Sequence, residues 1–384
     1  MKHKVGSVMM QLYERRWRLL AIALVILIAW GLAAWLTPYR QPRMVQFAVQ
    51  QNASANYVRA EVVELSGNKG KARIIDGDQH GQIVPIQFYG AETMHGGIVL
   101  LSEDTSLKSP NAAQPWRIPG LLFLGALMLV AVLAIGGRQG AMSLLGLSVS
   151  IAVIAYYIMP TASGGGNALV ASGIGAFAIA TIAIIVAHRL RWRTLVSLLC
   201  IYITLAIVIL LTVVSGWLAS LSGVYDETSS LLYQGGQSGL DMYGVLLGGI
   251  IIATLGVLDD VVTTQVAAVD ELRGAKPHAT WQELYSRGMS VGREHLSALI
   301  NTLALAYVGV ALPTTLILSQ QITNGTQLLT VLNYEYISVE VTRTIISSLG
   351  IIVAIPISTI LAVILISKRQ QLVLLAQSVV RRRR

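Results

Sequence analysis

Charged residues are scarce in this sequence. Asp, Glu, Lys and Arg together make up 12% of its 384 residues, whereas an ordinary soluble domain contains about 25%. Hydrophobic residues account for 54%, and the chain has several apolar runs that are each long enough to cross a hydrocarbon core about 30 Å thick. The composition therefore excludes an ordinary soluble protein and predicts one that lies in a lipid bilayer.

Cysteine and metal-binding patterns are also scarce. The single cysteine, Cys200, lies inside an apolar run, so no disulfide can form within the chain. The six histidines are scattered without helical pairing, and the sequence has no phosphate-binding P-loop. We therefore expect no metal site and no cofactor, and we do not expect an enzyme.

The positive charges are confined to particular loops. A formal net charge of +9 is shared by many nucleic-acid-binding proteins. Here, however, the basic residues lie in short loops between apolar runs, as in the cytoplasmic loops of membrane proteins. Loop 188–194 contains three arginines, whereas the charged residues of loop 218–242 are all acidic. We therefore expect the lipid bilayer, and not nucleic acid, as the partner.

The apolar runs predict eight transmembrane helices. We place them at 19–37, 118–136, 141–159, 167–187, 195–217, 243–267, 295–317 and 344–367. Apart from Arg343, the Lys and Arg residues of the short loops fall on the side of the N-terminus, which places residues 1–18 and the basic tail 368–384 in the cytoplasm. The expected fold is an all-α polytopic bundle in the cell membrane, with one helix followed by a seven-helix domain at 118–367.

The segment 38–117, between the first and second spans, is rich in β-strand signals. Residues 57–65 have strand composition, a turn follows at 66–70, and further short apolar segments extend to residue 101. About four short strands are typical of a small barrel or sandwich. We expect this domain on the extracytoplasmic side, with residues 108–116 as its linker to the second span.

Two adjacent carboxylates, Asp259 and Asp260, lie well inside the apolar run 243–267. A charge at mid-bilayer costs roughly 2.5–3.5 kcal/mol, so such a group must be protonated or face protein or water. Gly249, Gly256 and Asp260 share one helical face, and small residues let a neighbouring helix approach closely. We expect Asp260 on a packed face, with Asp259 about 100° away, and a pair that takes up and releases protons.

Polar residues on spans six and seven would complete such a relay. Thr263 and Thr264 continue the face of Asp260, and Asn301 and Thr302 lie in the cytoplasmic half of span seven. Asn301 would donate a hydrogen bond to a carboxyl group of span six, or it would only join two helices. The relay would not exist if span six ended near residue 258, because the acidic pair would then lie in the cytoplasm.

A second set of charged residues, Glu335, Glu340 and Arg343, precedes span eight. Glu340 would lie near a helix N-terminus, where negative charge is favoured. Glu340 and Arg343 are also three residues apart, which suits a helical ion pair. This set is either a capping ion pair or the external mouth of a pathway for a cation or a proton.

Four segments in the second half of the chain form a specific set of motifs. They are 256–272 (GVLDDVVTTQVAAVDEL), 286–293 (SRGMSVGR), 301–309 (NTLALAYVG) and 335–343 (EYISVEVTR). With these segments, the part of the chain that follows the β-rich domain resembles the YibE/F family. The family is described as membrane permeases without a settled substrate, so the resemblance implies transport.

Span six is similar, more distantly, to the proton-relay helix of resistance-nodulation-division pumps and of the SecD/SecF export helpers. In those proteins an Asp-Asp pair on a helix that runs from outside to inside carries protons, and Asp259 and Asp260 match that pair. The sequence departs from their pattern in its number of spans, in having no internal duplication, and in having no intramembrane Lys to pair with the aspartates. The resemblance implies proton coupling, with either a homodimer or larger homo-oligomer completing the bundle or a different relay.

Three functional hypotheses follow from the sequence. The first is a proton-coupled secondary transporter or exporter of an unknown small solute or ion. The second is a proton-driven accessory for the export or assembly of other proteins, with the β-rich domain as its working part. The third is a divalent-cation carrier, because carboxylate and amide oxygens suit hard cations. An intramembrane aspartic protease is excluded, because its two carboxyl groups must face each other, whereas adjacent residues of one helix diverge.

Overall fold

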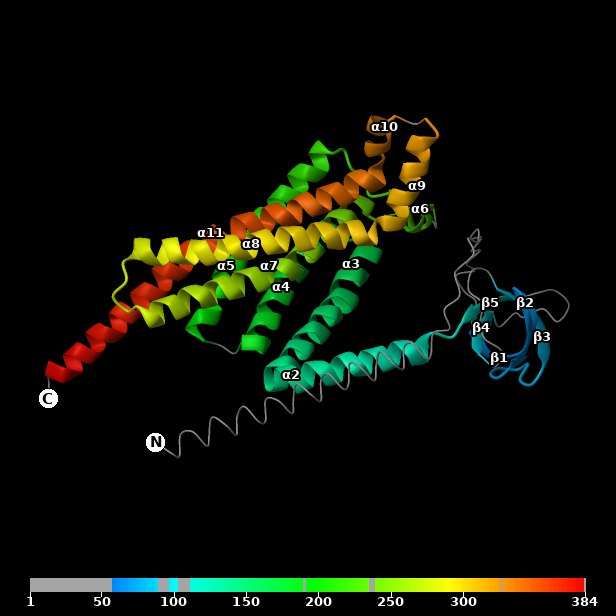
Figure 1. Cartoon of the computed structure of the whole chain (residues 1–384), viewed down its shortest axis with the longest axis horizontal. Helices are drawn as coiled ribbons and strands as arrows, with labels where there is room; N and C mark the ends of the chain where they lie inside the picture. Colours follow the sequence, from blue (N-terminus) through cyan, green and yellow to red (C-terminus); the bar gives the residue numbers. More distant parts are fainter. Residues whose placement is uncertain are drawn as a thin grey trace. The chain divides into compact units, whose positions relative to one another are not determined.

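The computed structural model describes residues 57–88, 97–102, 111–188, 191–234, 239–325 and 327–382. The predicted first span at 19–37 lies outside these residues. The chain divides into two compact units, residues 1–140 and 141–384. The first unit contains a β-barrel and the second a helical bundle (Figure 1).

Five strands close the barrel in the order β1-β2-β3-β5-β4. They are β1 (Tyr57–Ser66), β2 (Lys69–Ile74), β3 (Ile83–Phe88), β4 (Ile98–Ser102) and β5 (Asn111–Pro115). The β3–β5 pair is parallel and the others are antiparallel, which is the connectivity of the five-stranded OB-fold. The barrel option of the sequence prediction is confirmed, but the strand count was too low, because β5 lies in the predicted linker 108–116.

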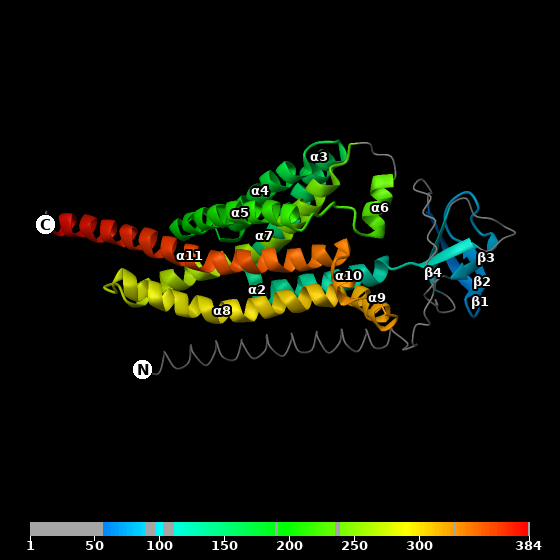
Figure 2. The ribbon, with the colours of Figure 1, turned by 90° about the horizontal axis from the view of Figure 1, so that it is seen from above.

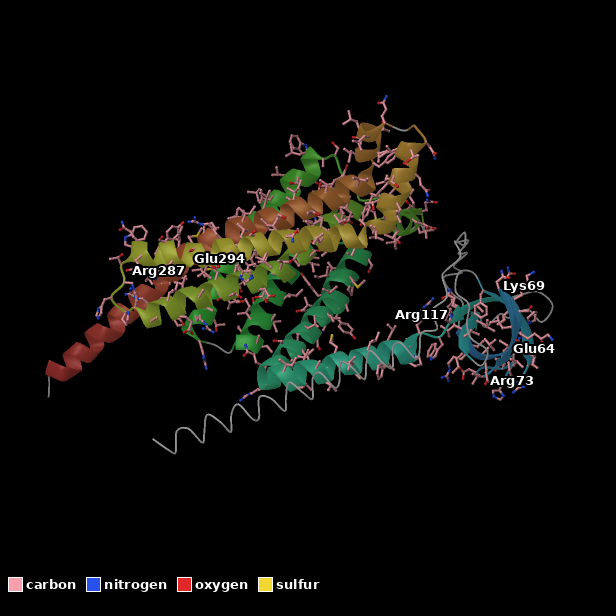
Figure 3. The ribbon with its side chains drawn as sticks, viewed as in Figure 1. Glu64, Lys69, Arg73, Arg117, Arg287 and Glu294 are labelled. Atoms are coloured by element: carbon pink, nitrogen blue, oxygen red, sulfur yellow. The ribbon has the colours of Figure 1, made fainter. Side chains whose placement is uncertain are left out.

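Side-chain alternation along the strands builds the barrel core. On β1, Val58, Ala60 and Val62 are buried, and the residues between them are exposed or half-buried. Charged side chains such as Glu64, Lys69 and Arg73 point outward from the barrel (Figure 3). This alternation, with one face inward and one face in solvent, is what a closed single-layer barrel requires.

An ion pair joins β1 to the turn after β2. The Arg59 Nε atom donates to an Asp76 carboxylate oxygen at 2.6 Å, and a second nitrogen donates to the other oxygen at 3.0 Å. The hydrogen bond from Arg59 holds the pKa of Asp76 below its usual value. The guanidinium also lies 5.8 Å from the Trp116 ring, so Arg59 connects the first strand to the end of the barrel domain.

The other regular elements of the described chain are helices. They are α2 (Ile118–Val153), the π-helix η1 (Ile154–Ile158), α3 (Met159–Ser163), α4 (Ala168–His188), α5 (Trp192–Leu218), α6 (Glu227–Gln234), α7 (Met242–Ala275), α8 (Trp281–Val310), α9 (Leu312–Thr323), α10 (Leu328–Leu332) and α11 (Glu335–Arg382). In the second unit, α7 and α11 pack against each other and against α5, while α4 covers α7 and α8 covers α11 (Figures 1 and 2).

Among the described residues, five helical segments are long and apolar enough to cross a membrane, or six if α8 and α9, which are bent by 70° relative to each other, form one span. One of these segments runs for 46 residues from Ile118 to Ser163, more than twice the roughly 20 residues that one span needs. It is broken at Gly137, whose φ of 51° and ψ of −131° are not helical. The break lies between the predicted spans 118–136 and 141–159.

The ends of several helices differ from the predicted spans. The α4 and α5 helices agree closely with the predictions at 167–187 and 195–217. By contrast, α7 extends past residue 267, and α8 begins at Trp281 instead of at residue 295. The bend in span seven is at Ala311, where α8 ends and α9 begins. Pro313 does not interrupt a helix, because it lies in the first turn of α9, where its missing N–H costs no hydrogen bond.

A buried glutamine holds the centre of the bundle together. The Gln265 side-chain nitrogen on α7 donates to the Gly288 carbonyl oxygen of α8 at 2.8 Å and to Thr359 Oγ1 of α11 at 2.7 Å. A Cβ atom at Gly292 would lie 2.5 Å from Ile355 Cγ2, so α8 can approach α11 this closely only with glycine there. We call the Gln265, Gly288 and Thr359 contact the glutamine clasp.

Candidate functional site

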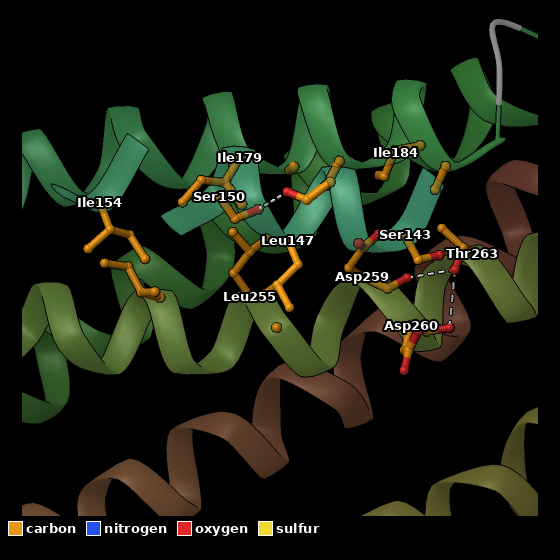
Figure 4. Close-up of a pocket in the computed structure, with 16 residues that line it drawn as sticks. Ser143, Leu147, Ser150, Ile154, Ile179, Ile184, Leu255, Asp259, Asp260 and Thr263 are labelled. Carbon is orange, nitrogen blue, oxygen red and sulfur yellow. Dashed lines mark hydrogen bonds between the residues drawn. The ribbon is translucent and has the colours of Figure 1, made fainter. Parts of the chain in front are cut away.

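Asp259 lies on the wall of a cavity inside the helical unit. The cavity has a volume of about 350 Å³. Its lining residues come from α2 beyond Gly140, η1, α4 and α7: Ser143, Gly146, Leu147, Ser150, Ile154, Ile179, Ala180, Ala183, Ile184, Ala187, Ile252, Leu255, Gly256, Asp259, Asp260 and Thr263. In Figure 4 the Asp259 side chain lies between α7 and the helix that carries Ser143, whereas Asp260 points away from that helix. We call this space the aspartate cavity.

One oxygen of Asp259 has no hydrogen-bond partner among the described residues. The Oδ1 atom is buried from solvent and makes no hydrogen bond with any described residue. Unsatisfied buried polar atoms are rare and costly, and the walls around this one are mostly aliphatic. The arrangement favours either a proton on this carboxyl group or a ligand that donates to it.

The structure reverses the expected roles of the two aspartates. Asp259 is half-buried and Asp260 is exposed, whereas the sequence analysis placed Asp260 on the packed face. A Cβ atom at Gly249 or Gly256 would meet no neighbour within 4 Å, so the small-residue face of α7 is open in the described unit. The packed face instead carries large side chains such as Leu258, and Asp259 adjoins it.

The two threonines of the predicted relay differ in position. Thr263 lines the aspartate cavity, and its hydroxyl donates to the Asp259 carbonyl oxygen at 2.8 Å (Figure 4). Such back-bonding leaves the hydroxyl oxygen free to accept from a ligand. Thr264 is exposed and does not line the cavity.

The structure does not bring the predicted polar residues of α8 to the aspartates. Asn301 and Thr302 are both exposed, and the Thr302 hydroxyl donates within its own helix to the Ala298 carbonyl oxygen. Neither residue lines the aspartate cavity. The opposite wall provides Ser143 and Ser150 instead, two hydroxyl-bearing residues seven positions apart, and therefore on one helical face.

Glu335 is a structural anchor in this structure. Its Oε1 atom accepts from the backbone N–H groups of Ser222 at 2.5 Å and Gly223 at 3.0 Å, and its Oε2 atom accepts from the Ser222 hydroxyl at 2.8 Å. The carboxylate thereby fixes the loop after α5 to the start of α11. Gly223 has a φ of +88°, and a side chain there would run into the Met242 backbone.

The other two charges of the predicted mouth form an ion pair. An Arg343 nitrogen donates to Glu340 Oε1 at 2.7 Å, and the two side chains are only 22% and 29% exposed. Glu340 Oε2 is buried and has no hydrogen-bond partner in the described chain. Glu340 also lines a second cavity of about 280 Å³.

Three hydroxyl groups connect the wall of this second cavity to α7. Tyr307 Oη lies 3.3 Å from Ser347 Oγ, which lies 2.9 Å from Thr254 Oγ1. The Thr254 hydroxyl donates to the Ile250 carbonyl oxygen at 2.8 Å. Because Thr254 has one proton, Ser347 must donate to Thr254 and Tyr307 must donate to Ser347.

Neither cavity has the ligand set of a metal site. Within the described ranges, no group of three or more His, Cys, Asp or Glu residues is placed to hold a metal ion. Asp259 and Asp260 diverge on their helix, and Glu340 already binds an arginine.

Several long apolar helices, together with acidic groups half-buried among them, define a multi-pass helical membrane protein. The family described as YibE/F-like protein matches residues 124–368, which is more than half of the chain. The chain therefore belongs to the YibE/F-like family. No curated protein and no solved structure matches it. The likeness of α7 to the proton-relay helix of the resistance-nodulation-division pumps and of SecD/SecF stays a prediction.

Proposed function

We propose that this protein is a proton-coupled secondary transporter in which Asp259 is the proton-carrying group. The observation that carries the proposal is a buried Asp259 oxygen on the wall of the aspartate cavity, which has no hydrogen-bond partner in the part of the chain that the structure describes. An ionisable group inside a membrane-spanning bundle is costly and is retained where it has a function. Thr263, Ser143 and Ser150 would bind water or a ligand beside it, and the exposed Asp260 would exchange protons with the outside of the cavity.

The charges at the two ends of α7 support a deep position for Asp259. Asp241 caps the start of α7 by accepting from the Gly244 N–H at 2.8 Å, and Asp270 lies 3.9 Å from Arg193 near its end. These two aspartates are about 44 Å apart along a straight helix, close to the 40–45 Å of a bilayer with its headgroups. Asp259 is about 16 Å from Asp270 on this axis, so it would lie roughly 9 Å inside a hydrocarbon core 30 Å thick.

The proposed topology has eight spans with both termini in the cytoplasm. The break at Gly137 would divide the long α2 segment into two spans, and α8 with α9 would form one bent span. With α4, α5, α7 and α11 this makes seven, and the predicted span at 19–37 is the eighth. Arg193, which lies beside Asp270, would then face the cytoplasm.

Proton flux into proteoliposomes tests the role of Asp259. The purified chain is reconstituted with a trapped pH dye, and a potassium diffusion potential drives proton entry. The isosteric Asp259→Asn variant should abolish the flux. The control Asp270→Asn, on the same helix but 40% exposed, should leave it near wild type. Flux of wild-type magnitude in Asp259→Asn would refute the proposal.

A second readout does not require a substrate. Hydrogen exchange of the α4 and α7 segments around the aspartate cavity should change between pH 5 and pH 8 in wild type, because adding a proton to Asp259 removes a buried charge. The Asp259→Asn variant should show the same exchange at both pH values once intrinsic rates are corrected. A pH response that persists unchanged in this variant would assign it to another group.

The barrel favours a second candidate function. It has its own core and an OB-type connectivity, which suits a binding module for another protein outside the membrane. A proton-driven accessory of export would then need residues 57–115 for client handling but not for proton flux. Deletion of residues 57–115 decides between the transporter and the accessory. Loss of client export with normal proton flux supports the accessory, and unchanged client export excludes the accessory.

A further inference from the structure

The second cavity lies at the bend between α8 and α9. Its lining residues are contributed by α8, α9, Ala311 between them, and α11: Tyr307, Val308, Ala311, Thr314, Thr315, Leu318, Tyr336, Ile337, Glu340, Val341, Thr344 and Ile345. It is separate from the aspartate cavity, which is lined by residues of α2, η1, α4 and α7 and shares no lining residue with it. We call this space the glutamate cavity.

We infer that the glutamate cavity binds a protonated amine with an apolar body, and that such amines are the class of cargo the protein exchanges for protons. The second half of this inference rests on the proposed transport function. The first half rests on the cavity alone.

Glu340 provides the recognition of the amine. One of its carboxylate oxygens accepts from Arg343, and the other is buried without a partner among the described residues. A buried carboxylate oxygen with no donor is costly, and a charged donor gives one of the stronger hydrogen bonds available in proteins. An ammonium group supplies both the N–H donor and the positive charge.

The rest of the cavity selects the body of the ligand. The Tyr336 and Tyr307 rings line it together with aliphatic side chains such as Val341 and Ile345. Aromatic rings attract cations over their faces, and aliphatic walls favour an apolar group. The Thr315 and Thr344 hydroxyls both donate to carbonyl oxygens of their own helices, so towards a ligand they can only accept.

Other ligand classes fit this cavity poorly. A hard divalent cation takes six or more oxygen ligands, whereas the cavity has one carboxylate, which is already shared with an arginine. An anion would meet the unpartnered Glu340 oxygen. A neutral apolar molecule would leave that oxygen unsatisfied, which costs about as much as a lost hydrogen bond.

The α9 helix is the wall that would admit the ligand. Its only buried residue is Leu318, and it follows a 70° bend at Ala311. An element with so few buried contacts moves at low cost. Figure 2 shows α9 and α10 at one end of the bundle, beside the start of α11. A small outward movement of α9 would expose the Glu340 oxygen that is closed off in this structure.

Calorimetric titration of the intact chain in phosphatidylcholine nanodiscs tests the binding. The probe is 2-phenylethylamine, and 2-phenylethanol is its uncharged match. Wild type should bind the amine saturably and the alcohol at least tenfold more weakly. Glu340→Gln should weaken amine binding at least tenfold, about 1.4 kcal/mol. Absent or non-saturable amine binding, or equal affinity for the alcohol, would overturn the inference.

Two further variants separate binding from folding. Val341→Phe adds a ring at an exposed position that lines the cavity and keeps Glu340 and Arg343 unchanged, and it should also weaken amine binding at least tenfold. Glu294→Gln changes an exposed glutamate of α8 outside the cavity (Figure 3) and should leave affinity within twofold. Amine affinity that survives Val341→Phe would place the ligand elsewhere, even if Glu340→Gln fails to fold.

Competition by lipid identifies the source of the amine. Phosphatidylethanolamine carries a primary ammonium, whereas phosphatidylcholine has no N–H donor. Unchanged probe affinity in nanodiscs that contain phosphatidylethanolamine supports a soluble cargo. Competition by phosphatidylethanolamine would assign the cavity to a lipid headgroup and overturn the inference that a soluble amine is the cargo.

Uptake of radiolabelled 2-phenylethylamine into proteoliposomes separates this inference from the proposed function. Uptake driven by a proton gradient and lost in Asp259→Asn supports both. Amine binding that depends on Glu340, combined with proton flux that is insensitive to Asp259→Asn, leaves the binding site standing and refutes proton coupling. Proton flux that depends on Asp259 without any amine binding refutes the glutamate cavity as a cargo site and leaves the proposed function intact.

Discussion

Replacing Gln265 by methionine should destabilise the helical unit by a small, definite amount. Methionine has a similar length and volume, so the change removes two hydrogen bonds, at 2.8 and 2.7 Å, without leaving a large cavity. Neither partner is left without a hydrogen bond, because the Gly288 carbonyl oxygen lies inside α8 and accepts from the helix backbone, and the Thr359 hydroxyl still donates to the Ile355 carbonyl oxygen at 2.7 Å. With about 0.6 kcal/mol for an average interhelical hydrogen bond in a membrane protein, the loss is roughly 1 kcal/mol.

The expected change can be measured as a shift of melting temperature in detergent. A loss of 1 kcal/mol corresponds to about 2–4 °C for a unit of 150–250 residues. Thr264→Val is the matched control, because Thr264 is the exposed neighbour of Gln265 and makes no contact with the clasp. Its melting temperature should stay within about 1 °C of wild type, since exposed substitutions change stability little.

A double-mutant cycle decides whether the clasp is the cause. Thr359→Val alone removes one of the two acceptors. The double variant should therefore be destabilised by about 0.6 kcal/mol less than the sum of the two single variants. Strict additivity, or a Gln265→Met variant as stable as the control, would show that the hydrogen bonds seen at Gln265 contribute nothing to stability.

Three further predictions concern other contacts. Gly223→Ala should destabilise the protein by about 1–3 kcal/mol, because the residue has a φ of +88° and its Cβ atom would meet the Met242 backbone. The control Gly325→Ala has a similar φ of +96° but open space around its Cβ atom, so its melting temperature should shift less. Gly292→Ala should destabilise the protein by about 1–3 kcal/mol, because the new Cβ atom would push α8 away from Ile355. Thermal melts in detergent should show this loss. The control Gly274→Ala, with nothing within 4 Å of its Cβ atom, should not lower stability. Because Arg59 lowers the pKa of Asp76, the pair stabilises the barrel above the usual aspartate pKa of about 3.9 and loses this effect as the pH falls through the lowered value. Corrected hydrogen exchange of β1 should therefore rise below pH 4 in wild type, and an equal rise in Asp76→Asn would contradict this.

The long apolar helices could be predicted from the sequence because their signal is local. Each apolar run reports its own helix, and α4 and α5 agree with the predictions within a few residues. The strand β5 could not be found in this way. Its sequence, Asn-Ala-Ala-Gln-Pro, contains no β-branched or aromatic residue, and it becomes a strand because the backbones of β3 and β4 both pair with it. Such pairing is a tertiary effect that a local pattern does not contain.

The candidate site shows the same limit. The sequence identified the acidic pair, but it could not tell which aspartate faces the cavity. The glycines at 249 and 256 suggested a packed face because small residues often mark helix contacts. In the structure these glycines are open, and the larger Leu258 and Val262 are packed instead. The cavity also depends on Ser143 and Ser150, which lie more than one hundred positions from Asp259 in the sequence.

The hydroxyl series between Tyr307 and Thr254 has a consequence for how the two cavities communicate. Each hydroxyl in it donates in one direction, and the last one, on Thr254, donates to the Ile250 carbonyl oxygen, which has no proton of its own to pass on. The series therefore does not conduct protons, although its hydrogen bonds join α8, α11 and α7. Coupling between Glu340 and Asp259 by this route therefore has to be a movement of helices and not a transfer of protons.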